Sequence, residues 1–166
     1  MKRLKVVLGM MGLLGLMTAC GEGEGPIQPP PAVPAEYADK HMPAGWWTDP
    51  KIIEEGKKIY TGEFNIDVNC ASCHGKDGKP VKRGARDFRN AERMKLYSDS
   101  TWFWRISEGV ANTKMKAWKE KLTEEERWKV VAFEHTFSHG GQPAAHDDYK
   151  PGSDKPAAAP GGGGSK

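Results

Sequence analysis

The chain has 166 residues, a mean hydropathy of -0.68 and a formal net charge of +3. This length leaves room for one ordinary domain, and the polar average excludes a polytopic membrane protein. Removal of the first nineteen residues would leave 22 basic and 22 acidic residues. A balance of zero gives no sign of a nucleic-acid-binding protein, and we expect no nucleic-acid partner.

Residues 1–19 have the pattern of a bacterial export signal. Basic residues at the start precede an apolar run over 6–17, which is too short to be a good membrane-spanning helix. The run ends in Leu16-Met17-Thr18-Ala19-Cys20, which resembles the lipobox of bacterial lipoproteins. An ordinary secretory signal and an uncleaved anchor are the alternatives. We expect Cys20 to be lipidated and to hold the protein at a membrane surface.

Low-complexity segments flank the expected folded unit. Residues 20–45 are rich in glycine and proline, and they predict a lipidated tether. Residues 141–166 predict a disordered tail. One domain is therefore expected over residues 46–140.

Two helices are expected in the first part of this domain. The first begins at Asp49-Pro50, where a capping carboxylate precedes proline at the first helical position, and it ends at Thr61-Gly62. The second begins near Ser98 or Ser100 and stops at Gly109.

The third helix has the clearest signal. It begins with the capping box Thr123-Glu124-Glu125-Glu126 and is expected to end at Gly140-Gly141. A short alternation at Phe64, Ile66 and Val68 is the nearest approach to a strand pattern. The sequence therefore predicts an all-α domain with long loops.

The stretch Cys70-Ala71-Ser72-Cys73-His74 brings three ligand-type side chains within five residues. A thioredoxin-like pair would need a strand-helix-strand context, and a structural zinc site would need four ligands. A bare disulfide would leave the histidine unexplained. Covalent haem explains all three, because two thiols bind the vinyl groups and the histidine binds the iron. The chain has one such motif, so one haem c is expected.

A haem would form much of the core of so small a domain. The chain is rich in tryptophan, and we expect most of these side chains to pack around the ring rather than to carry electrons. They are Trp46, Trp47, Trp102, Trp104, Trp118 and Trp128.

Further motifs accompany the Cys-Cys-His stretch in a fixed order. They are Gly56-Lys57-Lys58-Ile59-Tyr60, Arg86-Asp87-Phe88, Phe103-Trp104-Arg105-Ile106-Ser107-Glu108-Gly109, Met115-Lys116-Ala117-Trp118, Leu122 and Glu125-Glu126-Arg127-Trp128. With them, residues 50–138 resemble a short class I cytochrome c. The resemblance implies the cytochrome c fold, with helices packed around one covalently bound haem, and Gly56 at the crossing of the N- and C-terminal helices.

The resemblance also implies that Met115 is the axial ligand opposite His74. Met94 is a rival, although its charged segment lies only twenty residues after His74. Family members have a proline whose carbonyl receives the proximal histidine's hydrogen bond, and we expect Pro80 in that role. The segment 61–69 is longer than usual and has no assigned role.

The loop around Met115 also departs from the family's pattern. The family's ligand methionine is often bracketed by prolines, whereas here lysines flank it, which predicts a less rigid loop. Four other histidines are conceivable ligands but are expected to be surface or packing residues. They are His41, His135, His139 and His146.

With both axial positions filled, the expected function is one-electron transfer and not catalysis at the iron. The predicted protein is an electron carrier of a bacterial respiratory or other envelope chain, with its haem domain on the periplasmic or extracytoplasmic side. A fixed subunit of a quinol-oxidising complex or terminal oxidase is the main alternative. A haem gas sensor or small peroxidase is a further one.

Basic residues are concentrated in the middle of the chain. Residues 76–121 hold thirteen Lys or Arg against six Asp or Glu, a local charge of +7. Those flanking the haem motif and Met115 are expected to surround the haem edge and to dock an acidic redox partner. They are Lys76, Lys79, Lys82, Arg83, Lys114, Lys116 and Lys119.

Overall fold

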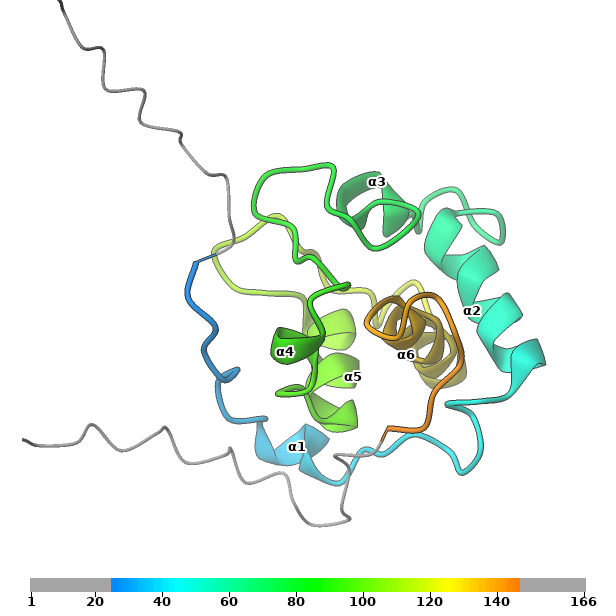
Figure 1. Cartoon of the computed structure of the whole chain (residues 1–166), viewed down its shortest axis with the longest axis horizontal. Coiled ribbons are helices and arrows are strands. Elements are labelled where there is room, and N and C mark those ends of the chain that lie inside the picture. The colour runs from blue at the N-terminus through cyan, green and yellow to red at the C-terminus, as the bar shows by residue number, and fades with distance from the viewer. Residues whose placement is uncertain (1–24, 147–166) are drawn as a thin grey trace, which may run out of the picture.

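The computed structural model describes residues 25–146. Figure 1 shows helices joined by long loops, without a strand in this part of the chain, as the sequence predicted. The helices are α1 (Ala35–Ala38), α2 (Pro50–Thr61), α3 (Ala71–His74), α4 (Ala91–Met94), α5 (Asp99–Glu108) and α6 (Glu124–Phe137). None of these described helices is long and apolar enough to cross a membrane. Cys20, the signal segment and the tail beyond residue 146 lie outside the described residues.

The starts of the three main helices agree with their predicted caps. Asp49 accepts hydrogen bonds from the first backbone N–H groups of α2, and Ser98 and Thr123 do the same for α5 and α6. Both reciprocal bonds of the capping box between Thr123 and Glu126 are present. These local bonds satisfy backbone donors that would otherwise lack a partner.

Helix α6 ends at Phe137, earlier than the predicted stop at Gly140-Gly141. The backbone carbonyl of Thr136 accepts hydrogen bonds from the N–H groups of His139 and Gly141, each at 2.9 Å. The chain has therefore already turned away from the helix axis before it reaches the two glycines.

Helices α2 and α6 pack directly against each other at Gly56, as predicted. A Cβ atom at Gly56 would lie 1.9 Å from the carbonyl oxygen of Lys129. Further along the same interface, the ring of Tyr60 packs against Phe133 at a centroid distance of 5.2 Å and against Phe137 at 5.5 Å. The absence of a side chain at Gly56 thus sets how closely the two backbones approach.

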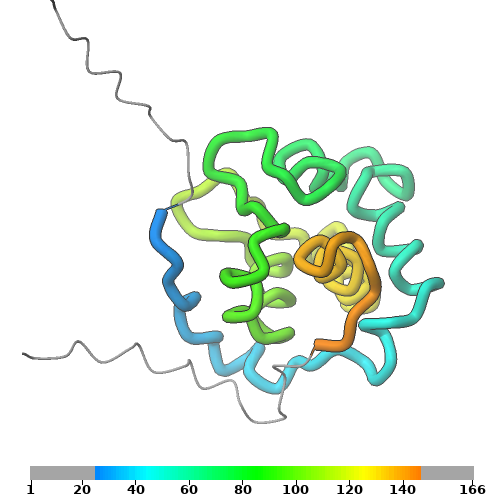
Figure 2. The backbone as a smooth tube through the Cα atoms, in the orientation of Figure 1, coloured from blue at the N-terminus to red at the C-terminus, as the bar shows by residue number. Residues whose placement is uncertain are grey.

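The segment before α2 packs on the domain over part of the range expected to be a tether. Tyr37 and Met42 are buried, and the Tyr37 hydroxyl donates to Glu108 at the end of α5. Figure 2 shows this segment running past α4 and α5 toward the start of α2. The packed part of the chain therefore begins before residue 46, because two apolar side chains of this segment pack into the core.

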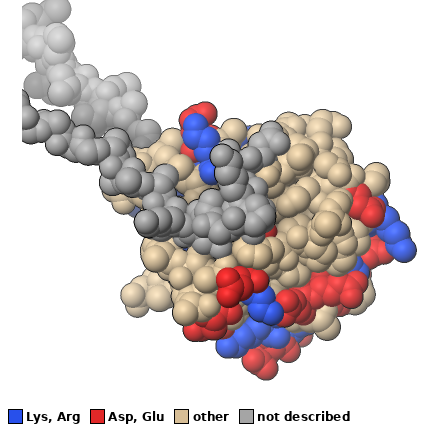
Figure 3. Space-filling view, turned by 90° about the horizontal axis from the view of Figure 1, so that it is seen from below, with Lys and Arg blue, Asp and Glu red and all other residues tan. Residues whose placement is uncertain are grey.

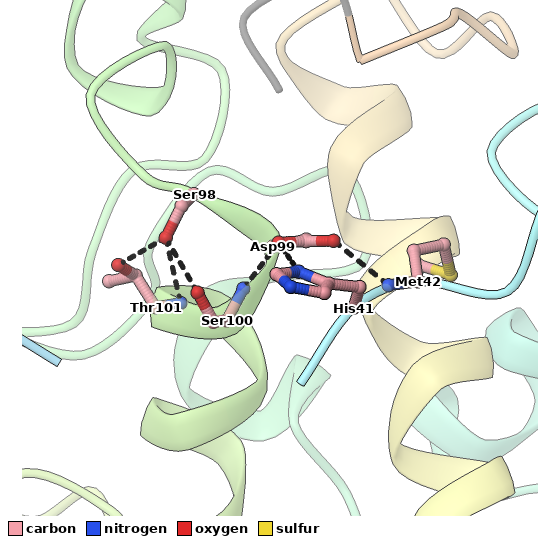
Figure 4. Close-up of polar contacts among 6 residues, drawn as sticks. All are labelled: His41, Met42, Ser98, Asp99, Ser100 and Thr101. Carbon is pink, nitrogen blue, oxygen red and sulfur yellow. Dashed lines mark hydrogen bonds and ion pairs between the residues drawn. The ribbon is translucent and has the colours of Figure 1, made fainter. Parts of the chain in front are cut away.

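Asp99, the first residue of α5, holds this segment in place through hydrogen bonds (Figure 4). Its carboxylate is 1% exposed and accepts a 2.9 Å hydrogen bond from the backbone N–H of Met42. The other oxygen lies 3.4 Å from Nδ1 of His41 and accepts a bond from the N–H of Ser100. One buried carboxylate thus joins the N-terminal segment to the helix that leads to Met115.

Candidate functional site

Helix α3 is a single turn that carries the whole Cys-Cys-His motif. The N–H groups of Cys73 and His74 donate to the carbonyl of Cys70 at 3.0 and 2.9 Å. Cys70 is buried, Cys73 is half-buried, and both are free thiols. Both sulfur atoms are therefore available for bonds to another group.

The His74 ring is oriented by a backbone carbonyl. Its Nδ1 atom lies 3.1 Å from the carbonyl oxygen of Arg86, so Nδ1–H is the donor and Nε2 keeps its lone pair for a metal. Burial lowers the pKa of His74, which favours the neutral ring that a metal requires. The ring also stacks on Phe88 at a centroid distance of 4.4 Å.

The expected acceptor for His74 was Pro80, and the structure shows this expectation to be wrong. The chain around Pro80 folds back on α3 instead, because the N–H groups of Val81 and Lys82 both donate to the carbonyl of Cys73. The carbonyl that accepts the hydrogen bond from His74 belongs to Arg86, six residues after Pro80.

Met115 lies in the loop that follows α5 and packs, half-buried, against the core. Its N–H donates to Oγ1 of Thr113 at 3.1 Å, and its carbonyl accepts from the N–H of Val110 at 3.0 Å. Gly109 has a φ of +71°, and a Cβ atom there would lie 2.4 Å from the Met115 carbonyl oxygen. The loop is thus held by hydrogen bonds and close packing, although it lacks the prolines that often bracket such a methionine.

The methionine and histidines that were alternative ligands to Met115 have different neighbours. Met94 in α4 is 3% exposed and belongs to the core. His41 faces Asp99, as described above. His135 is buried, its Nε2 lies 3.1 Å from Nδ1 of His146, and its ring lies 4.4 Å from that of His139.

Two buried tryptophan donors test whether a haem fits here. Within residues 25–146, Nε1 of Trp102 and Nε1 of Trp118 are buried and have no hydrogen-bond acceptor. Buried donors rarely stay unpaired, so these two suit a group that brings its own acceptors. Haem brings two propionate carboxylates.

A cluster of arginines points to the same conclusion. Arg86, Arg93 and Arg105 line a cavity of about 370 Å³ together with Tyr97 and residues of the segment 25–31. Burial lowers the pKa of Arg105 and the positive charge of Arg86 lowers it further, so an anion between the two arginines would relieve their repulsion. The residues present therefore fit haem, and Arg86, Arg105 and the two tryptophans are the candidates for holding its propionates.

Across the described residues, no group of three or more His, Cys, Asp or Glu side chains converges as a metal site.

Comparisons with known proteins found a matching family model and several similar solved structures. A family model described as "Cytochrome C oxidase, cbb3-type, subunit III" matches residues 52–133. The solved "KustC0563 c-type cytochrome" is 36% identical, with 49% of this chain and 95% of that chain covered and a TM-score of 0.44. A search of curated proteins gave no match.

Two further solved structures are more distant. One is the Kuenenia stuttgartiensis reducing HAO-like protein complex Kustc0457/Kustc0458, at 23% identity, with 54% of this chain and 44% of that chain covered and a TM-score of 0.44. The other is cytochrome cL from Methylophaga aminisulfidivorans MPT, at 20% identity, with coverages of 70% and 75% and a TM-score of 0.42. All three TM-scores are low, so the superpositions add no evidence beyond the 36% sequence identity of the first solved structure.

Proposed function

Because the chain belongs to the c-type cytochromes, we propose that it is a one-electron carrier of a bacterial respiratory or other envelope electron-transfer chain. The family establishes covalently bound haem c, an electron-transfer role and a haem domain outside the cytoplasm. The proposal adds the attachment residues, the ligands, the membrane anchor and the partners. The observation that carries it is the Cys70–His74 turn, whose histidine is already oriented by the Arg86 carbonyl.

Cys70 and Cys73 hold the haem, and His74 and Met115 are its axial ligands. The bound haem supplies a one-electron iron couple. His74 would offer a neutral Nε2 to the iron, and the hydrogen-bonded loop carries the Met115 thioether that would be the second ligand. With both positions taken, substrate has no open site on the iron, and outer-sphere electron transfer is the chemistry that remains.

The surrounding side chains keep this site dry and rigid. Phe88 covers the His74 ring, and Trp102 is 3% exposed next to it, at a centroid distance of 5.5 Å from Phe88. An apolar shell and a thioether ligand both stabilise ferrous iron and raise the potential. A rigid site also keeps the structural change between the two oxidation states small.

The partner docks on the basic residues around the haem motif and the Met115 loop. Lys76, Lys79, Lys82, Arg83, Lys114 and Lys116 are all exposed. Lys119 forms a 2.9 Å ion pair with Glu108, so its charge is partly balanced. By contrast, Figure 3 shows acidic and basic side chains mixed along the edge of the face opposite α3. An acidic redox protein is therefore best matched to the α3 side.

A lipid on Cys20 holds the domain at the membrane. Because α1 packs on the domain, the free chain from Cys20 ends no later than residue 34, and its fifteen residues span at most roughly 47 Å when extended. Nη2 of Arg93 also donates to the carbonyl of Gly25 at 2.6 Å, which shortens the reach further. The haem domain thus stays close to the bilayer.

The second candidate function is a fixed subunit of a membrane complex. It is favoured by the description of the matching family model, which names an oxidase subunit. Extraction of native membranes with mild detergent and identification of the copurifying proteins separates the two. A carrier is extracted from the membrane by itself or with substoichiometric partners. A subunit copurifies with membrane-spanning proteins in a fixed ratio.

The attachment residues are tested by Cys70→Ala and Cys73→Ala, expressed with the bacterial haem-attachment machinery. We expect each variant to lose most of its covalent haem, as measured by the mass of the denatured chain, whereas Ser72→Ala keeps one haem per chain. A wild-type chain that remains entirely without haem would refute the proposal.

A further inference from the structure

A buried acid lies in the middle of helix α6. Glu134 is 3% exposed, and its neighbours one turn away on the helix, Val130, Val131 and Phe137, are buried and apolar. Burial alone raises the pKa of Glu134 to about 8, with no hydrogen bond or cation of the described residues offsetting it. A carboxyl group in such a place is costly to ionise, and the mechanism proposed above does not use it.

Glu134 lies beside the haem-attachment turn. Tyr60 of α2 packs against Phe133 and Phe137, which flank Glu134 on α6, and its hydroxyl donates to the carbonyl of Gly75, the residue after His74. Phe137 also lies 6.4 Å from Phe88, ring centroid to ring centroid, and Phe88 stacks on His74. Glu134 therefore lies on the stretch of α6 whose aromatic neighbours pack, through Tyr60 and Phe88, against Gly75 and His74.

We propose that Glu134 is a redox-linked proton site: it takes up one proton when the haem iron gains one electron. The proposal rests on the haem site proposed above. The iron is reduced from ferric to ferrous by an electron from the redox partner, and the Glu134 carboxylate becomes a carboxylic acid with a proton from bulk water. Oxidation reverses both changes, so charge near the buried site stays nearly constant through the cycle.

The other titratable groups around Glu134 cannot take this role. The Tyr60 hydroxyl already donates to the carbonyl of Gly75 at 2.7 Å, and its pKa is raised. Cys70 and Cys73 become thioethers when haem is attached. His135, next along α6, stays neutral because burial and two neighbouring histidines lower its pKa to about 3.

The charged groups of α5 and the remaining cations of α6 are engaged elsewhere. Asp99 accepts the Met42 N–H, Arg105 lies over the Trp104 ring, Glu108 binds Tyr37 and Lys119, Arg127 binds Ser107, and Lys129 pairs with Glu55 and Glu125. Among these described side chains, Glu134 is the buried group left to titrate near neutral pH, and the Glu134→Gln variant separates its titration from that of the haem propionates.

The sign of the effect follows from electrostatics. An ionised Glu134 stabilises the more positive ferric site, so the reduction potential falls as pH rises through the range in which Glu134 loses its proton. A coupling of one proton to one electron gives a slope of at most about 59 mV per pH unit, the tenfold factor for a one-electron couple. Outside that range the potential is flat.

The test is an optical redox titration of the haem-loaded full chain at a series of pH values from about 5 to about 10. We expect the wild-type potential to fall over part of this range and the Glu134→Gln potential to be flat there, because glutamine keeps the shape and cannot ionise. The control Glu125→Gln, an exposed acid on the same helix, should behave like wild type. A flat wild-type curve, or an unchanged slope in Glu134→Gln, would overturn the proposal.

A second measurement needs no variant. The infrared difference spectrum of the wild type, reduced minus oxidised, near pH 8 should show the C=O band of a carboxylic acid appearing on reduction. Its absence would contradict proton uptake by a carboxyl group. A chain that binds no haem would refute the proposed function, whereas a haem-loaded chain with a flat potential would overturn only the role of Glu134.

Discussion

The Nδ1 atom of His74 lies 3.1 Å from the carbonyl oxygen of Arg86. This contact sets the tautomer and the plane of the ring, because Nδ1 must carry the proton and Nε2 must then point away from the loop. The same loop carries the Arg86 side chain to the cavity that Arg93 and Arg105 also line. One segment thus orients the ring of His74, the proposed proximal ligand, and places a cation at the cavity proposed to hold a propionate.

Met115 is tested against Met94. Met115→Ala should remove the weak far-red absorption band of the ferric protein and lower its potential, because both come from the thioether ligand. Met94→Leu should leave both unchanged, since Met94 is buried in α4 and a volume-conserving swap costs under about 1.5 kcal/mol. Visible spectra and a redox titration measure both effects. If the two variants exchange these results, Met94 is the ligand.

The close packing of Gly109 against the Met115 loop gives a second prediction. Gly109→Ala would place a Cβ atom 2.4 Å from the Met115 carbonyl oxygen, so we expect the loop to shift and the far-red band to weaken. Gly84→Ala is the matched control, because Gly84 also has a positive φ, +86°, but no atom within 4 Å of the added Cβ. The control should lose about 1–2 kcal/mol of stability and keep its spectrum. Equal spectral changes in Gly109→Ala and Gly84→Ala would mean that backbone strain, and not contact with the Met115 loop, causes the effect.

The basic residues around the haem edge predict a salt-dependent reaction. The rate of electron transfer to an acidic redox protein should fall as the Debye length shrinks from about 30 Å at 0.01 M to about 8 Å at 0.15 M ionic strength. Stopped-flow kinetics should show this dependence flattened in Lys114→Glu with Lys116→Glu, whose side chains are exposed beside Met115.

A charge-matched control separates docking from net charge. Lys51→Glu with Lys57→Glu changes two exposed lysines of α2, away from the Met115 loop, and should keep most of the salt dependence. A rate that ignores salt in the wild type would mean that the partner is permanently bound or docks elsewhere.

The buried Glu134 also predicts how stability changes with pH. Its pKa is raised in the folded state from an ordinary 4.5 to about 8, so the folded chain binds more protons than the unfolded chain between these values. The free energy of unfolding should therefore fall as pH rises from about 4.5 to about 8. Denaturant titrations should show this fall reduced in Glu134→Gln and unchanged in Glu125→Gln. A Glu134→Gln curve that superimposes on wild type would mean that the acid is not buried in solution.

Features set by neighbouring residues were predictable from the sequence. The capping box at Thr123, the proline after Asp49 and the Cys-Cys-His turn all act through bonds within a few residues. Gly56 was predictable through the family resemblance, which implied a close helix crossing there.

Features set by tertiary contacts were not predictable in the same way. Every residue has a backbone carbonyl, so the sequence alone could not select Arg86 over Pro80 as the partner of His74. Tyr37 and Met42 are surrounded in sequence by prolines and small residues, and only the three-dimensional structure shows that their side chains are buried in the core. Glu134 carried a signal that was missed: it follows the apolar run Val130-Val131-Ala132-Phe133, which marks a buried stretch.

The central claim is that a covalent haem with both axial positions filled by His74 and Met115 transfers one electron. Optical redox titration of the purified full chain tests it most directly. We predict a single one-electron transition with low-spin, six-coordinate spectra in both oxidation states and no rapid change when carbon monoxide is added to the ferrous protein. A five-coordinate ferrous spectrum that carbon monoxide converts at once would contradict the claim and indicate a sensor or peroxidase.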